Sequence, residues 1–540
     1  MGFVTLVAAA SLSGLSAGVA TGAVVATTAS AATTTAAACR PPAGSTHVSA
    51  TPVAGVPSDW DVTSFDGTQI RAHWFPVELP GGARAPTILM GPGWSLSGDT
   101  DTQGNGVLGD IPIKDLRAAG YNVLTWDPRG FGRSGGQAEV DSPEYEARDV
   151  SSLISWVAGL PGVELDGPGN PRMGMVGGSY GGGIQLVTAA IDCRVDAIVP
   201  TIAWHSLITS LDKADTAKTG WSNILANLSS ADHVDPMVHQ AQATGNGTGL
   251  VTPAEQAWFA ARGPGPLVSR IHIPTLIVQG TVDTLFTLQE GVTNYEILKH
   301  DGAPTSMVWF CGGHGECLTP PGNRQLPLTA TIAWLNRYVK GNRSVSTGPG
   351  FRFVDQHGNE YSAPAYPVPT SSPITAGGHG TLSMVAAGGS GPSPAQAVGQ
   401  TLGSLVGPIT PAPAANAVDV DVSFARRSAL VVGAPQLRLT YHGTSPPGPH
   451  PTRVFAQLVD RSTGLVLGNQ ITPIEVVLDG RTHTLTVPLE MVAFTATPAS
   501  HLELQLVATT VAYAQPRLGG TVDFTQVRLT LPVASTLTPR

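Results

Sequence analysis

One segment of the sequence, residues 172–191, constrains the fold more than any other. It reads RMGMVGGSYGGGIQLVTAAI, an apolar run of strand length followed by an apolar, helix-favouring run. Ser179 lies between the two runs, in a G-x-S-x-G pattern. A strand that turns directly into a helix at a serine lifts the hydroxyl group above the edge of a sheet. Ser179 is therefore a candidate nucleophile.

The same pattern occurs a second time, in GRSGG around Ser134. A strand-like run, YNVLTWD, precedes it, but the chain then passes through GGQAEVDSPEYEA before any helical pattern begins. Because no helix follows the serine directly, we expect Ser134 to lie in a loop and not to act as the nucleophile.

Strand-like and helical patterns alternate over residues 45–345, which we assign to one α/β domain. Such alternation predicts a mostly parallel sheet covered by helices on both faces. A longer insertion, residues 204–270, is rich in helix formers. We expect it to form a cap over an active site. The alternative is a helical excursion without a role in the chemistry.

A serine hydroxyl becomes a useful nucleophile when a base takes its proton and a carboxylate orients that base. Asp283 follows the apolar run PTLIVQG, and His314 follows the apolar run TSMVWF in a glycine-rich loop. The chain order Ser, Asp, His is that of α/β-hydrolases. We therefore predict an α/β-hydrolase fold with Ser179, Asp283 and His314 as the catalytic triad.

Acyl transfer also requires hydrogen-bond donors directed at the developing oxyanion. The backbone N–H of Tyr180, the residue after the serine, is one candidate. The strand-like run APTILM leads into GPGW, and we assign the second donor to Trp94. The alternative at Trp94 is an ordinary Pro-Gly turn. No metal-ligand spacing, phosphate-binding loop or dinucleotide fingerprint occurs in the sequence, so we expect no cofactor.

From about residue 350 the sequence changes to short alternating strands separated by turn residues, and helical periodicity disappears. We expect an all-β sandwich over residues 350–540 and assign FRFVDQHGNEY, residues 351–361, to it. Residues 370–417 are rich in Gly, Ala, Ser and Pro. This composition predicts a flexible linker or a long loop.

Residues 1–38 carry no charge and are rich in Ala, Gly, Ser and Thr, which is typical of an export signal, although the usual positive start is missing. The alternative is a disordered Ala-rich N-terminus. No other segment is long and apolar enough to span a membrane. We therefore expect a secreted or cell-envelope protein.

Four cysteines fit an exported protein with up to two disulfides. Cys311 and Cys317 are close enough in sequence to close a small loop, which leaves Cys39 to pair with Cys193. The alternative is that Cys39 ends a degenerate lipobox and carries a lipid anchor.

Charge limits the partners. The net charge is −9 and only 12% of residues are charged, with no Lys/Arg cluster. This argues against nucleic acid and anionic membrane surfaces as partners. We expect a small-molecule ester, amide or peptide as the substrate; the sequence does not indicate an oligomeric state.

Four segments and the C-terminal β region carry a family resemblance; the segments are DPRGFGRSGG, GNPRMGMVGGSYGGGIQ, VQGTVDTLF and CGGHGECL. Together they resemble the X-prolyl dipeptidyl-peptidase and cocaine-esterase group of serine hydrolases. The resemblance implies a Ser-His-Asp acylase, esterase or peptidase with a helical cap and a C-terminal jelly-roll domain. This chain departs from the group at Trp94, where its members place a tyrosine whose hydroxyl donates to the oxyanion.

Three functions remain open at the level of the sequence. An esterase is favoured over an X-prolyl or other dipeptidyl peptidase, because a peptidase of that kind needs a carboxylate that holds the free amine of the substrate. The acids of the insertion are mixed with Lys and Arg and form no such pattern. A non-catalytic binding protein that uses its β-sandwich is the third hypothesis. The acids of the insertion are Asp212, Asp215, Asp232, Asp235 and Glu255.

Overall fold

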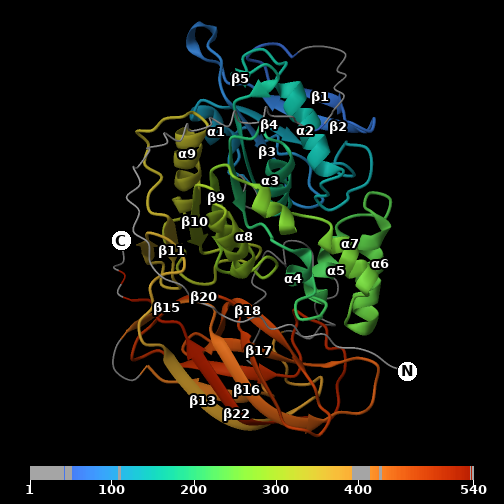
Figure 1. Ribbon diagram of the computed structural model, residues 1–540, viewed down its shortest axis with the longest axis vertical. Coiled ribbons are helices and arrows are strands. Elements are labelled where there is room, and N and C mark those ends of the chain that lie inside the picture. Colours follow the sequence, from blue (N-terminus) through green and yellow to red (C-terminus); the bar gives the residue numbers. More distant parts are fainter. Residues whose placement is uncertain are drawn as a thin grey trace, which may run out of the picture. The chain divides into compact units, whose positions relative to one another are not determined.

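The computed structural model describes residue 42 and residues 52–106, 111–391, 414–424, 428–535 and 537. The expected export segment, residues 1–38, and the expected disulfide or lipid site at Cys39 lie outside the described residues. Figure 1 shows the arrangement of the helices and strands. Among the described residues, no helix combines the length and the apolarity needed to cross a membrane.

A ten-stranded mixed sheet lies at the centre of the first part of the chain, with the order β1-β2-β4-β3-β7-β8-β9-β10-β11-β12. All neighbours from β4 to β11 run parallel, and the outer pairs run antiparallel. The strands are β1 (Ser58–Thr63), β2 (Gln69–Phe75), β3 (Thr87–Met90), β4 (Asn122–Trp126), β7 (Met173–Gly178), β8 (Ala197–Thr201), β9 (Thr275–Gly280), β10 (Thr305–Phe310), β11 (Phe351–Val354) and β12 (Glu360–Ala363); a separate hairpin holds β5 (Leu165–Gly167) and β6 (Asn170–Pro171).

Helices cover both faces of this sheet (Figure 1). Every residue of β3, β4, β7, β8 and β9 is buried, as expected for parallel strands whose apolar runs are covered on both sides. One core contains side chains of α2 (Glu146–Val157), α3 (Tyr180–Ile191) and α8 (Leu288–His300), and a second contains side chains of α1 (Ile113–Ala118) and α9 (Leu326–Tyr338).

Residues 204–270, which we call the cap segment, are helical. The helix α6 begins after Asp235, whose side chain accepts the N–H of Met237, and it ends at Gly249 in the left-handed conformation. Thr252 and Glu255 form a capping box that starts α7. The elements are α4 (Leu207–Leu211), α5 (Thr219–Asn227), α6 (Pro236–Thr248), α7 (Pro253–Ala260) and η2 (Gly265–Arg270).

The C-terminal strands form a β-rich region with two four-stranded antiparallel sheets, β13-β22-β16-β19 and β14-β21-β17-β18, and the pair β15-β20. Apolar side chains of both sheets share one core. The chain therefore has an α/β-hydrolase fold followed by a β-rich region; the jelly-roll arrangement stays a prediction. The strands are β13 (Ile374–Ser383), β14 (Val418–Val422), β15 (Ala429–Gly433), β16 (Gln436–Thr444), β17 (Thr452–Asp460), β18 (Leu465–Val476), β19 (His483–Pro488), β20 (Val492–Ala496), β21 (Leu502–Val507) and β22 (Thr521–Leu531).

The assignment of FRFVDQHGNEY to the β-sandwich is wrong. These residues supply β11 and the start of β12, and β11 runs parallel to β10 in the ten-stranded sheet. The ring of Trp309 in β10 packs edge-on against Phe351 with 4.9 Å between centroids. An outer strand of a mixed sheet and a strand of a sandwich show the same short apolar alternation, so the pattern could not separate them.

The expectation of a linker or loop over residues 370–417 is wrong for its first part, which contains the ten-residue strand β13. Residues 392–413 lie outside the described residues. The glycines of β13 allow close packing: a Cβ on Gly378 would lie 2.7 Å from Val420 Cγ2, and a Cβ on Gly380 would lie 2.9 Å from Val418 Cγ1. Glycine here serves the contact between β13 and β14, although its frequency in the sequence suggested flexibility.

Glycines at the turn between β7 and α3 allow backbone to pack directly on backbone. Gly177 has a φ of 135°, which disfavours any other residue. A Cβ on Gly181 would lie 1.9 Å from the carbonyl oxygen of Gly91, and a Cβ on Gly182 would lie 2.7 Å from that of Thr201. The turn therefore tolerates no side chain at these positions.

We expect Gly181→Ala to lower the free energy of unfolding by about 1–3 kcal/mol or more, because the added methyl group forces the backbone of Gly91 to move. Gly247→Ala is the matched control: Gly247 lies in α6 with no atom near its would-be Cβ. That control should be neutral or stabilising by up to about 1 kcal/mol. Urea unfolding measures both values, and equal values for the two variants would contradict the prediction.

Candidate functional site

Ser179 forms the turn between β7 and α3. Its φ of 57° and ψ of −117° lie in a region that residues other than glycine rarely adopt. The N–H of Ser179 donates to the carbonyl oxygen of Thr201 at 2.9 Å, which ties this turn to the end of β8. The strand-turn-helix geometry expected around Ser179 is therefore present.

The structure brings the three residues of the expected triad together. His314 Nε2 lies 2.8 Å from Ser179 Oγ, and His314 Nδ1 lies 2.8 Å and 2.9 Å from the two carboxylate oxygens of Asp283. Asp283 is completely buried, and its Oδ1 accepts the N–H groups of Leu285 and Phe286 at 3.1 Å and 2.8 Å. These donors compensate the charge of a carboxylate that water does not reach.

The ring of His314 is held by aromatic contacts and by its loop. The rings of Phe286 and Trp221 pack edge-on against it, at centroid distances of 5.1 Å and 5.6 Å. A disulfide joins Cys311 and Cys317 on either side of the histidine, as the sequence suggested. Its effect is to limit the freedom of a loop that contains three glycines. The second expected pair, Cys39 with Cys193, depends on a residue outside the described ones.

Lys218 of the cap segment holds the loop that follows Asp283. Its Nζ donates to the carbonyl oxygens of Thr284 and Leu285, both at 3.1 Å. Burial lowers the pKa of Lys218 to about 8, while the nearby charge of Glu490 acts in the opposite direction. The sequence analysis missed this lysine, because nothing local in the cap segment relates it to Asp283.

Gln470 of β18 contacts the same loop from the β-rich region. Its Nε2 donates to the backbone carbonyl oxygen of Asp283 at 2.8 Å, and the glutamine is buried. At Gly468 nearby, a Cβ would lie 2.6 Å from the carbonyl oxygen of Thr281. The loop with Asp283 is thus packed against a strand that lies 187 residues further along the chain. This contact was also missed, since a single glutamine in a strand gives no sequence signal.

Trp94 lies beside the serine, and its indole is already engaged. The indole Nε1 donates to the carbonyl oxygen of Leu225 in α5 at 2.9 Å, and the ring packs edge-on against Tyr180 at 5.2 Å. The backbone N–H of Tyr180 opens α3 and has no acceptor within that helix. The indole is therefore not available as an oxyanion donor. The role of the two backbone N–H groups stays a prediction.

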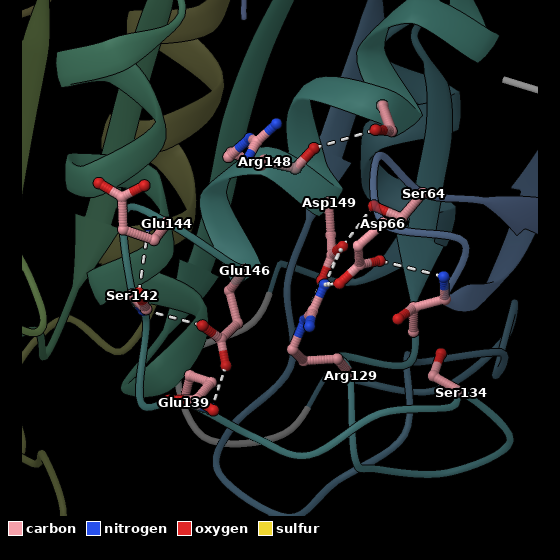
Figure 2. A network of polar contacts seen from close by, with 12 residues as sticks. Ser64, Asp66, Arg129, Ser134, Glu139, Ser142, Glu144, Glu146, Arg148 and Asp149 are labelled. Carbon is pink, nitrogen blue, oxygen red and sulfur yellow. Dashed lines mark hydrogen bonds and ion pairs between the residues drawn. The ribbon is translucent and has the colours of Figure 1, made fainter. Parts of the chain in front are cut away.

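A cluster of buried acids lies behind Tyr180. The hydroxyl group of Tyr180 donates to Glu146 Oε1 and accepts the N–H of Asp141, both at 3.2 Å. Glu146 also accepts the N–H groups of Glu139 and Ser142 (Figure 2). Burial raises the pKa of Glu146 to about 7 and raises the pKa of Asp141 well above its usual range.

A buried ion pair adjoins these acids. Arg129 donates to both carboxylate oxygens of Asp149, at 2.7 Å and 2.8 Å, and to Asp66 at 3.1 Å (Figure 2). Ser134 lies in the adjacent loop, where its hydroxyl group donates to the carbonyl oxygen of Asp127 at 2.6 Å and accepts the N–H of Arg71 at 2.8 Å. The second G-x-S-x-G pattern therefore belongs to a loop in which the serine binds backbone groups.

A cavity of about 100 Å³ opens beside Ser179, lined by that residue, Tyr180, Trp94 and side chains of the cap segment. Within the part of the chain that the structure describes, no group of three or more His, Cys, Asp or Glu residues could hold a metal ion.

Comparisons with known proteins agree with this arrangement. The family model for X-Pro dipeptidyl-peptidases (S15 family) matches residues 66–316. A polyketide transferase from a Penicillium species is 29% identical over 143 residues, which are 26% of this chain and 43% of that protein. The chain spans less than half of the length of the curated relatives that it matches.

Solved structures share the fold over most of the chain. A CocE/NonD family hydrolase from Staphylococcus aureus matches with a TM-score of 0.66 at 13% identity, over 89% of this chain and 97% of that one. An α-amino acid ester hydrolase matches with a TM-score of 0.61 at 13% identity, over 90% and 98%. The family model therefore confirms, over residues 66–316, the resemblance to the X-prolyl dipeptidyl-peptidase and cocaine-esterase group that the sequence suggested. Over most of the chain the solved structures show a shared fold.

Proposed function

We propose that this chain is a serine hydrolase that cleaves an ester, or an amide, through an acyl-enzyme on Ser179. One observation carries the proposal: His314 lies within 2.8 Å of both the hydroxyl group of Ser179 and the carboxylate of Asp283. His314 Nε2 takes the proton of Ser179 as Oγ attacks the carbonyl carbon of the substrate. Asp283 keeps Nδ1 protonated and stabilises the imidazolium that forms.

The remaining steps follow from the same groups. The backbone N–H groups of Tyr180 and Trp94 donate to the oxyanion of the tetrahedral intermediate. When the intermediate collapses, His314 gives its proton to the leaving alcohol or amine. A water molecule then attacks the acyl-enzyme with His314 again as the base, which releases the acid and restores Ser179.

We further propose the organisation around this chemistry. Residues 204–270 act as the cap of the site, which is supported by the side chains that they contribute to the cavity beside Ser179. The β-rich region is proposed to be a jelly roll, in keeping with its two antiparallel sheets around one core. Export of the chain is supported by the Cys311–Cys317 disulfide, since oxidising compartments allow such bonds.

A dipeptidyl peptidase of the X-prolyl kind is the second candidate. It would need a carboxylate for the free amine of the substrate, and Asp212 of the cap segment lines the cavity. Burial raises the pKa of Asp212 to about 6, and its Oδ2 accepts a hydrogen bond from Gln256 Nε2 at 2.8 Å. Hydrolysis of Xaa-Pro anilides in place of simple esters would favour this candidate.

The nucleophile is tested by a fluorophosphonate label. Ser179→Ala should abolish labelling and lower kcat at least about a thousandfold, because no other group takes over the attack. Ser134→Ala is the control: it removes two hydrogen bonds to backbone groups, so it should cost about 1 kcal/mol of stability and keep the label. A label on Ser134, identified by mass spectrometry of the peptides, would overturn the assignment of Ser179.

The contact from the β-rich region to the acid is tested by Gln470→Leu. This change removes the donor to the carbonyl oxygen of Asp283, so the acid and His314 lose alignment. We expect kcat to fall about tenfold, the equivalent of about 1.4 kcal/mol, with KM unchanged. The control is Gln457→Leu, another buried glutamine of this region, whose amide donates to Gln505. It should lower stability and leave kcat unchanged, and an equal loss of kcat in both variants would contradict a positioning role.

The disulfide beside His314 is tested by the double variant Cys311→Ser/Cys317→Ser. Closing a loop of this size stabilises a protein by about 2 kcal/mol in the chain-entropy model, and misplacing a catalytic base by about 1 Å costs roughly a hundredfold in rate. We expect a lower kcat, while hydrogen exchange of the strands β13–β22 stays unchanged. An unaltered kcat, or two free thiols in the unreduced wild-type protein, would disprove this role.

A further inference from the structure

The cavity beside Ser179 is walled mainly by apolar side chains of the cap segment. They come from all four of its helices, so the cap segment as a whole encloses the space. Ser179 lines the same cavity, so a carbonyl group attacked by its Oγ has its acyl portion next to this wall. The apolar cap residues include Leu207, Leu211, Leu225, Val238, Ala241 and Phe259.

Aromatic rings complete the wall on the side of the sheet. Tyr180 stacks on Trp204 with 6.4 Å between centroids, and Trp204 packs against Phe286 at 4.9 Å. Trp94 joins the same row through its edge-on contact with Tyr180. All four side chains line the cavity. Because each ring packs against at least one other, the rings support one another along the wall.

The cavity presents little to a charged ligand. Asp212 is the one charged residue among the described side chains that line it. The Oδ1 atom of Asp212 is buried and has no partner, and Oδ2 is occupied by the amide of Gln256. The amide nitrogen of Gln242, also on the wall, donates to Asn223 and Asn227. An ammonium group would therefore find a single unpartnered carboxylate oxygen, Asp212 Oδ1, and would lose the rest of its hydration to apolar side chains.

We propose that this cavity is the acyl pocket of the enzyme and that it takes an uncharged, apolar acyl chain. The inference rests on the proposed acyl-enzyme at Ser179 and names its substrate class: esters of apolar carboxylic acids. Each methylene group that moves from water to this wall favours the bound state, so the rate should rise with chain length until the cavity is full. A peptide with a free N-terminal amine gains at most one contact of its amine, to Asp212 Oδ1, and loses the hydration of that amine to the apolar wall.

The test compares p-nitrophenyl acetate, butanoate, hexanoate and octanoate with an α-amino acid p-nitrophenyl ester and an Xaa-Pro anilide. We expect kcat/KM for hexanoate to exceed that for acetate at least about tenfold, since four more methylene groups are buried. The amino ester and the anilide should be poorer substrates than hexanoate. If kcat/KM for octanoate is equal to or lower than that for hexanoate, the cavity holds an acyl chain of about six carbons, as expected for a pocket of limited length.

Two variants of α6 test whether the acyl chain of the substrate binds in this cavity. Ala241 is buried against the cavity, whereas Ala243 is exposed on the same helix. Ala241→Phe fills the cavity and should lower the hexanoate-to-acetate ratio of kcat/KM at least about tenfold. Ala243→Phe is the matched control and should leave this ratio and both rates unchanged. Retained fluorophosphonate labelling of Ala241→Phe would show that the variant is folded.

The outcomes separate the two proposals. An enzyme that labels at Ser179 but prefers acetate, or keeps its ratio in Ala241→Phe, would overturn the acyl pocket and leave the hydrolase intact. An amino ester as the best substrate, with that activity removed by Asp212→Asn, would make the cavity an amine site and would also overturn it. The absence of both labelling and turnover with every ester would instead defeat the proposed hydrolase.

Discussion

The close backbone contact around Ser179 is the constraint on which the rest of the site depends. The turn holds a serine at a φ of 57°, a conformation that costs about 1–3 kcal/mol and persists only when the surroundings enforce it. The surroundings here are backbone: Gly181 lies directly against the carbonyl group of Gly91, and the N–H of Ser179 is bonded to Thr201. The turn is thereby fixed to the strands on both sides of β7, which place Ser179 at the carboxyl edge of the sheet.

The loop with Asp283 depends on a different kind of support. A buried carboxylate requires donors, and Leu285 and Phe286 supply them only while their loop keeps its shape. Lys218 and Gln470 hold the carbonyl groups of that loop from the cap segment and from the β-rich region. Two distant parts of the chain therefore converge on one short segment, and the hydrogen bond that Asp283 accepts from His314 depends on both.

The sequence correctly predicted those features of the fold that depend on short local patterns. The parallel α/β sheet followed from alternating apolar runs, and the strand-turn-helix geometry at Ser179 followed from the apolar helical run that comes directly after this serine. The family resemblance was visible in short segments, and DPRGFGRSGG, GNPRMGMVGGSYGGGIQ and VQGTVDTLF lie within the residues that the family model matches. Each of these signals spans a few residues, so no knowledge of the tertiary contacts was needed.

The errors and omissions concern contacts between distant segments. The strand β11 carries the alternation of a sandwich strand, and only its pairing with β10 places it in the large sheet. The glycines of β13 suggested flexibility, but they allow contact with side chains of β14. Lys218 and Gln470 act on Asp283 from positions that no spacing rule connects to it. Composition and spacing describe a segment by itself. The positions of β11, of the glycines of β13, and of Lys218 and Gln470 depend on contacts with segments that are distant in sequence.

The cap segment contacts both the proposed acyl pocket and the loop that carries the proposed catalytic acid. Its apolar side chains line the cavity that faces Ser179, while Lys218 from the same segment bonds the loop that follows Asp283. Trp94 is joined to it as well, through the bond from its indole to Leu225. A displacement of this segment would thus change the shape of the cavity, the position of the acid and the turn that holds Trp94 at once. The shape of the proposed acyl pocket and the alignment of the proposed triad therefore depend on the same segment of the chain.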